Sequence, residues 1–140
     1  MLLHDPHQIP EPVLALSGLT YIVPSYMAFQ QGRIYYGSSC LFLSFTTVGF
    51  HGTRNETLFQ LDCIAILNFV SVLIYNSLTS SHYAQAICYT SILYSLISYF
   101  VGQRYKIMSF DPDWDTQMFY HSIMHISSSY SALLFIKETM

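Results

Sequence analysis

Almost all of the charge in this chain is confined to the two termini and to the short breaks between five apolar stretches. The sequence has five basic and eight acidic residues among 140, so 9% of its residues are charged while 52% are hydrophobic. Soluble domains have about a quarter of their residues charged, and they need these residues to cover their surface. We therefore expect an integral membrane protein, and the chain is long enough for a single domain that comprises residues 1–140.

The apolar stretches have the length of membrane-spanning helices, because about 20 helical residues cross a hydrocarbon core of about 30 Å. They show no period-two alternation, which disfavours a transmembrane barrel. The expected fold class is therefore all-α, an integral membrane bundle of about five transmembrane helices. Pro24 is expected to kink the first helix. The stretches are Val13–Gln30, Ile34–Phe50, Leu58–Leu78, His82–Val101 and Gln117–Ile136.

Asp62 is the only acidic or basic residue inside one of these stretches. A carboxylate within a membrane is costly unless it is paired, neutral or next to a wet cavity, so Asp62 marks a candidate functional site. Its position near the start of a helix also allows its side chain to reach the interface without any function. The sequence alone leaves both interpretations open.

Two histidines open the last apolar stretch. His121 and His125 are four residues apart, so their side chains lie on the same face of a helix and can hold one metal ion. Such a pair is common on soluble helices that bind nothing. Within a membrane, however, ionisable groups are rare and usually functional.

The order of the helices brings further polar residues to this pair. His51 directly follows the second stretch, and the chain returns at once, so Asp62 lies on the same side of the membrane. Two more crossings bring the last stretch back to that side. Thr47 precedes His51 by four residues and shares its helix face, one turn deeper. The sequence therefore predicts that one cluster contains Thr47, His51, Asp62, His121 and His125.

The residue types in this cluster are those of a catalytic zinc site. Three histidines with an open fourth position form such a ligand set, and water or substrate completes it. Asp62 can orient or deprotonate a water whose pKa the metal lowers to about 7. The hydroxyl of Thr47 can donate to a developing oxyanion. We expect His4, His7 and His82 to lie outside the site, the first two before the first stretch and the third across the membrane.

The same residues resemble the signature of a membrane-protein family. Phe50-His51 is followed by Asp62, eleven residues after the histidine, and His121-Ser122-Ile123-Met124-His125 lies far downstream. This ordered set resembles the CREST superfamily, which contains the alkaline ceramidases, the adiponectin-type PAQR receptors, the GPI-anchor lipid-remodelling hydrolases and the myomaker-like proteins. The family signature is Ser-x-x-x-His, then Asp, then His-x-x-x-His. Here Thr47 stands in place of the serine.

The resemblance implies that His51, His121 and His125 bind Zn²⁺ and that Asp62 contacts the zinc-bound water. It implies a ceramidase-like intramembrane hydrolase that cleaves a membrane lipid amide or ester, with ceramide or a glycerolipid as the substrate. Family members have seven helices. The loss of two helices as a pair would leave the last helix starting on the same side. A second copy of the chain, in a homo-oligomer, could replace the missing wall of the lipid cavity.

Two other functions are compatible with the sequence. In a non-catalytic membrane-remodelling, fusion or receptor-type protein, zinc would stabilise the fold without taking part in a reaction. A fourth protein ligand to the zinc would then be expected. A haem-binding bundle would use paired histidines from different helices. Nucleic acid is not expected as a partner, because five basic residues and a net charge of −3 form no basic patch. The sequence contains no signal for a particular organelle, and its few basic residues do not fix a membrane orientation.

Overall fold

The computed structural model describes residues 10–138, and every regular element among these residues is helical. The predicted all-α fold class is confirmed. Of the histidines placed outside the site, His4 and His7 lie outside the described residues. The elements are α1 (Pro12–Gly18), η1 (Leu19–Tyr21), α2 (Ile22–Gln30), α3 (Ile34–Thr53), α4 (Glu56–Ser77), α5 (His82–Tyr105), η2 (Met108–Phe110) and α6 (Trp114–Glu138).

Five helical rods correspond to the five predicted stretches, with α1, η1 and α2 forming the first rod. Two boundaries differ at the predicted site. Helix α3 continues to Thr53, so His51 lies within the helix and not in the break. Helix α6 begins at Trp114 and not at Gln117. Asp113 starts it, because its Oδ2 accepts a hydrogen bond from the backbone N–H of Thr116 at 2.9 Å. Hydrogen bonds from Thr116 also hold the pKa of the Asp113 carboxyl below its usual range.

The first rod is interrupted just before Pro24. Proline has no backbone N–H, and its ring crowds the carbonyl group four residues earlier, which here belongs to Thr20. The chain forms a 3₁₀ turn over Leu19–Tyr21 before it resumes as α2. Proline therefore interrupts the first rod where the sequence predicted a kink.

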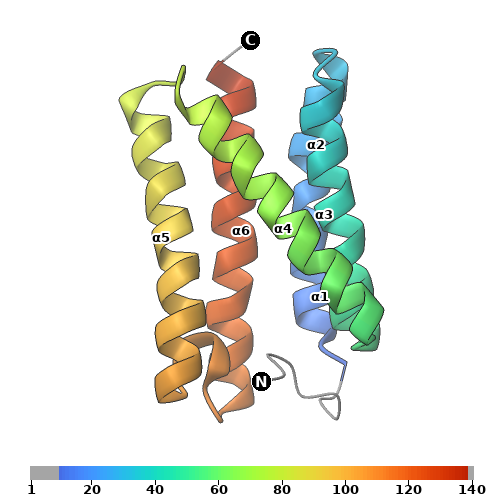
Figure 1. The fold of residues 1–140 in the computed structure, drawn as a ribbon, viewed down its shortest axis with the longest axis vertical. Helices are drawn as coiled ribbons and strands as arrows, with labels where there is room; N and C mark the ends of the chain where they lie inside the picture. Colours follow the sequence, from blue (N-terminus) through green and yellow to red (C-terminus); the bar gives the residue numbers. More distant parts are fainter. Residues whose placement is uncertain (1–9, 139–140) are drawn as a thin grey trace.

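Helices α3 and α6 are the central elements of the bundle. Helix α3 packs against α1, α2 and α4, while α6 packs against α1, α2 and α5. Figure 1 shows α5 and α6 side by side, with α4 crossing the bundle diagonally. One continuous core joins the rods, and it includes Tyr21, Leu43, Phe69, Leu73 and Phe135.

Three rods are long and apolar enough to cross a membrane. They are Pro12–Gln30, Glu56–Ser77 and His82–Tyr105, with mean hydropathies of 1.3, 1.9 and 1.3. Large apolar side chains cover their outer faces; Leu67, for example, is 70% exposed. An apolar outer surface of this extent is typical of a membrane protein.

The other two rods, α3 and α6, are more polar because they carry the histidines and many hydroxyl groups. These hydroxyl groups point into the bundle. The mean hydropathy of α3 and α6 is therefore lowered by side chains that face the bundle interior and that a surrounding lipid would not contact. The buried examples are Ser39, Ser44, Thr46 and Thr47 on α3 and Ser129 and Ser131 on α6.

Candidate metal centre

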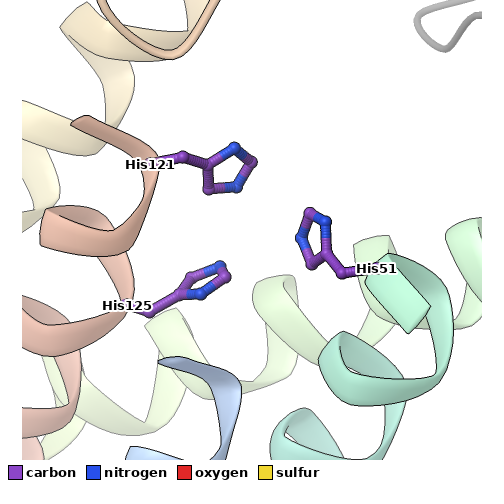
Figure 2. Close-up of side chains that lie close together, drawn as sticks. All are labelled: His51, His121 and His125. Atoms are coloured by element: carbon purple, nitrogen blue, oxygen red, sulfur yellow. The ribbon is translucent and has the colours of Figure 1, made fainter. Parts of the chain in front are cut away.

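His51, His121 and His125 meet at one end of the bundle, which we call the metal end. Each offers a ring nitrogen, and these three atoms all lie within 4.8 Å of one another. The ring centroids are 5.0 Å apart for His51–His121, 5.5 Å for His51–His125 and 5.0 Å for His121–His125. Figure 2 shows the three rings around a common space, with one ring from α3 and two from α6. The predicted convergence of the three histidines is confirmed.

The tight connection between α3 and α4 keeps the end of one helix and the start of the next at the metal end. Arg54 ends α3 in the left-handed conformation, with φ of 58°, and its N–H bonds the carbonyl of Phe50. Asn55 then caps α4 by accepting hydrogen bonds from the N–H groups of Thr57 and Leu58. His51 and Asp62 are thereby held near the same level of the bundle.

Glu11 belongs to the metal end, although the sequence analysis did not place it there. It is only 1% exposed, and its Oε2 lies 2.7 Å from Nδ1 of His51 and also accepts a hydrogen bond from Arg54. A carboxylate can only accept, so Nδ1 of His51 carries the proton. The other nitrogen of the neutral ring, Nε2, then carries the lone pair that a metal ligand needs. Helix order could have identified Glu11, because it starts the first helix at the end where His51 lies.

His125 is oriented in a similar way by Ser17 of α1. Its Nδ1 lies 2.7 Å from Oγ of Ser17. The only hydroxyl hydrogen of Ser17 is donated to the carbonyl of Leu14 at 2.8 Å, so Ser17 accepts the hydrogen bond from His125. Nε2 of His125 therefore also carries the lone pair that a metal ligand needs. Imidazole donors fixed by outer hydrogen bonds are the usual arrangement around zinc and related transition metals, and this donor set fits such an ion.

Asp62, which the sequence predicted in the same cluster, is not among the three clustered residues. It is 6% exposed, and its Oδ1 accepts hydrogen bonds from the hydroxyls of Thr46 and Thr47, each at 2.8 Å. A threonine hydroxyl has a single hydrogen, so in this arrangement Thr47 donates to Asp62 and not to an oxyanion. The structure therefore makes Thr47 a partner of Asp62, a role that the sequence analysis did not assign.

Ser122 provides a further hydroxyl next to His121. Its Oγ is buried and has no hydrogen-bond partner within residues 10–138. A buried hydroxyl without a partner can donate to a bound molecule. Nothing in the sequence distinguished this serine from the many others on the helices.

Comparison of the chain with protein-family models, with curated proteins and with solved structures found no match. The functional proposals below are therefore based on the residues of the metal end and on the resemblance of their spacing to a known signature.

Proposed function

We propose that the chain is a multi-pass membrane protein with five spans and that it binds Zn²⁺ through His51, His121 and His125. The observation that carries this proposal is the cluster of three imidazoles, of which His51 and His125 are buried and His121 is half-buried. The Nδ1 atoms of the two buried rings are engaged by Glu11 and Ser17. A site with three protein ligands leaves one of the four usual zinc positions for water or substrate. Helices α3 and α6 count as spans because their polar side chains face the bundle interior.

We further propose that this site hydrolyses a membrane lipid amide or ester, as in the CREST superfamily that the spacing resembles. A bound zinc ion would polarise the scissile carbonyl and lower the pKa of water. Asp62 is the proton carrier in this proposal. Both threonine hydroxyls bond its Oδ1, and its Oδ2 accepts no hydrogen bond from the described residues, so Oδ2 takes up and returns the proton. Thr46 and Thr47 hold the carboxylate in one orientation.

A structural role for the metal is the second candidate. The site joins α3 to α6, and its outer hydrogen bonds reach Glu11 and Ser17 at the N-terminal rod. A metal that holds α3 and α6 together in a small bundle would contribute directly to its folding free energy. This function would not require Asp62.

Metal analysis of the purified protein tests the zinc proposal. We expect stoichiometric zinc in the wild type and almost none in the double variant His121→Ala/His125→Ala. The matched control is His82→Ala, because His82 starts α5 at the opposite end of the bundle. Absence of zinc from a well-folded wild type would refute the proposal, and a haem absorption band would favour the haem-binding alternative.

A release assay with long-chain ceramide and glycerophospholipid substrates tests the hydrolase proposal. We expect Asp62→Asn to lower the rate by at least about 100-fold because a general acid–base residue is lost, while the zinc content stays unchanged. The control is Asp115→Asn, which removes an exposed carboxylate from the first turn of α6. Full activity of Asp62→Asn would show that Asp62 is not the proton carrier. A zinc-loaded wild type that cleaves none of these lipids would favour the structural role.

A further inference from the structure

We propose that Ser122 binds the substrate at the metal end and that its hydroxyl donates a hydrogen bond to the carbonyl oxygen of the lipid. This inference rests on the proposed function, because it uses the metal site of that proposal and the amide or ester carbonyl of its substrate. The sequence predicted such a donor role for Thr47, whose hydroxyl donates to Asp62 instead. Ser122 directly follows a histidine of the cluster, and its hydroxyl hydrogen has no acceptor among residues 10–138.

The position of Ser122 on α6 places it beside both histidines of that helix. It follows His121 directly and precedes His125 by three residues, so Ser122 and His125 are neighbours on one helix face, one turn apart. Met118, four residues before Ser122, is buried, as is His125. Ser122 therefore belongs to the inner face of α6, the part of the helix from which the rings of His121 and His125 reach towards His51 in Figure 2.

The hydroxyl of Ser122 differs from those of the other four serines of α6, which all have an acceptor. Three of them donate to carbonyl groups three or four residues earlier in the helix, namely Ser127, Ser128 and Ser131. Ser129 donates to the carbonyl of Thr20. The carbonyl of Met118 is four residues before Ser122, yet Oγ of Ser122 forms no hydrogen bond with it or with any other described residue. A buried hydroxyl without a partner lowers the stability of a protein, and a ligand can supply the missing partner.

A carbonyl oxygen suits this donor. It accepts hydrogen bonds without donating any, and it carries no charge that would have to be buried with it. The scissile carbonyl also lies next to the metal, because the metal polarises it in the proposed reaction. As this oxygen gains negative charge during attack by water, a donor already held in place stabilises it more strongly. An ether lipid has no carbonyl and would leave the hydroxyl of Ser122 unpaired, so this residue favours amide and ester lipids.

Binding of palmitohydroxamic acid to the zinc-loaded full chain in detergent micelles tests this proposal. The probe chelates zinc through a carbonyl oxygen and a hydroxamate oxygen, and it is not cleaved. We expect Ser122→Ala to weaken its binding by about tenfold, because one hydrogen bond is lost, while the zinc content stays unchanged. Ser122→Thr keeps the hydroxyl and should bind the probe like the wild type, as should the control Ser129→Ala. Equal affinities of Ser122→Ala and the wild type would overturn the proposal.

The unfolding temperature of the metal-free protein separates this role from a structural one. Ser122→Ala removes a buried hydroxyl that has no partner, so the unfolding temperature should stay the same or rise. Ser129→Ala should lower it, because the carbonyl of Thr20 loses its donor and Pro24, four residues later, has no N–H to replace it. A decrease for Ser122→Ala as large as that for Ser129→Ala would show that Ser122 stabilises the fold and would overturn the proposal.

Lipid release distinguishes a failure of this inference from a failure of the proposed function. With an active wild type, Ser122→Ala should lower kcat by about 100-fold, as the loss of one oxyanion donor does in other hydrolases. A fully active Ser122→Ala would overturn this inference and leave the hydrolase proposal intact. A zinc-loaded wild type that cleaves no lipid would refute the hydrolase proposal and, with it, a substrate-binding role for Ser122.

Discussion

At the scale of single residues, Glu11 affects both the balance of buried charge at the metal end and the affinity of the site for a metal ion. Its carboxylate is buried between His51 and Arg54, and a buried charge is tolerated only when it is paired. The same carboxylate fixes the ring orientation of His51 and makes Nε2 a better ligand. Outer partners of this kind typically contribute a factor of about 10 to 100 to metal affinity.

We therefore expect Glu11→Gln to weaken zinc binding by about 10- to 100-fold, since the amide keeps the shape but loses the charge. Competition with a chromophoric chelator measures this effect. The control is Glu56→Gln, which removes an exposed carboxylate from the first turn of α4. The double variant Glu11→Gln/Arg54→Gln restores the charge balance, so it should recover stability but not affinity. Equal weakening by Glu56→Gln would indicate a general charge effect instead.

Thr47 and Asp62 give a second expectation at this scale. Thr47→Val keeps the shape of the side chain but removes the donor to Oδ1 of a buried carboxylate. We expect a loss of about 1–3 kcal/mol in the free energy of unfolding, and Thr47→Ser should restore most of it because it retains the hydroxyl. Denaturant unfolding in detergent micelles measures both variants. A loss for Thr47→Ser with none for Thr47→Val would mean that the threonine methyl, and not its hydroxyl, stabilises the site.

The three histidines could be predicted from the sequence because spacing along a helix and the order of crossings are properties of the chain itself. Glu11 belongs to the same class, since helix order alone places it at the metal end. Ser17 does not. Its contact with His125 depends on how α1 is rotated against α6, and the sequence contains no periodic signal for that rotation. The partnership of Thr47 with Asp62 depends in the same way on the rotation of α3 against α4.

At the scale of helices, the close approach of α1 to α3 depends on Gly18. A Cβ at Gly18 would lie 2.7 Å from Cγ2 of Thr47, and its carbonyl also accepts a hydrogen bond from Ser44 at 3.0 Å. Small residues permit this kind of contact between helices in membranes. The approach also sets the distance between Ser17 and the metal end.

Gly18→Ala is accordingly expected to reduce the free energy of unfolding by about 1–3 kcal/mol, because it overpacks the contact with Thr47. Gly52→Ala is the matched control within α3. A Cβ at Gly52 would meet no atom within 4 Å, so this change should be neutral or stabilising. Thermal unfolding of both variants in the same detergent measures the difference. A neutral Gly18→Ala would show that the two helices can separate without loss.

The presence of each helix could be predicted from the length of its apolar stretch, whereas the residues at which the helices begin and end could not. The ends of α3 and α6 are set by local caps at Arg54 and Asp113, which extend both helices beyond their apolar stretches. Hydropathy also identifies α3 and α6 less clearly than the other rods. The reason is that these two helices carry the polar groups of the site, so the functional residues weaken the signal that locates their own helices.

At the scale of the whole molecule, a metal ion would connect α3 to α6, the two helices that supply its three ligands. We expect removal of zinc by a strong chelator to lower the stability of the wild type by about 4 kcal/mol when the metal is present at about 1,000 times its dissociation constant. Thermal unfolding with and without chelator measures this change. The double variant His121→Ala/His125→Ala should not respond to chelator. An unchanged wild type would mean that the metal does not stabilise the fold.

The distribution of the site along the chain also fixes when it can form during synthesis. Glu11, His51 and Arg54 all lie in the first 54 residues and contact one another directly, so this half of the site can assemble while the ribosome is still translating. The other two imidazoles are on α6, the last helix to be made among those described. A nascent chain arrested before α6 would therefore present one oriented imidazole and no chelating cluster. Metal loading would then report that the bundle has been completed.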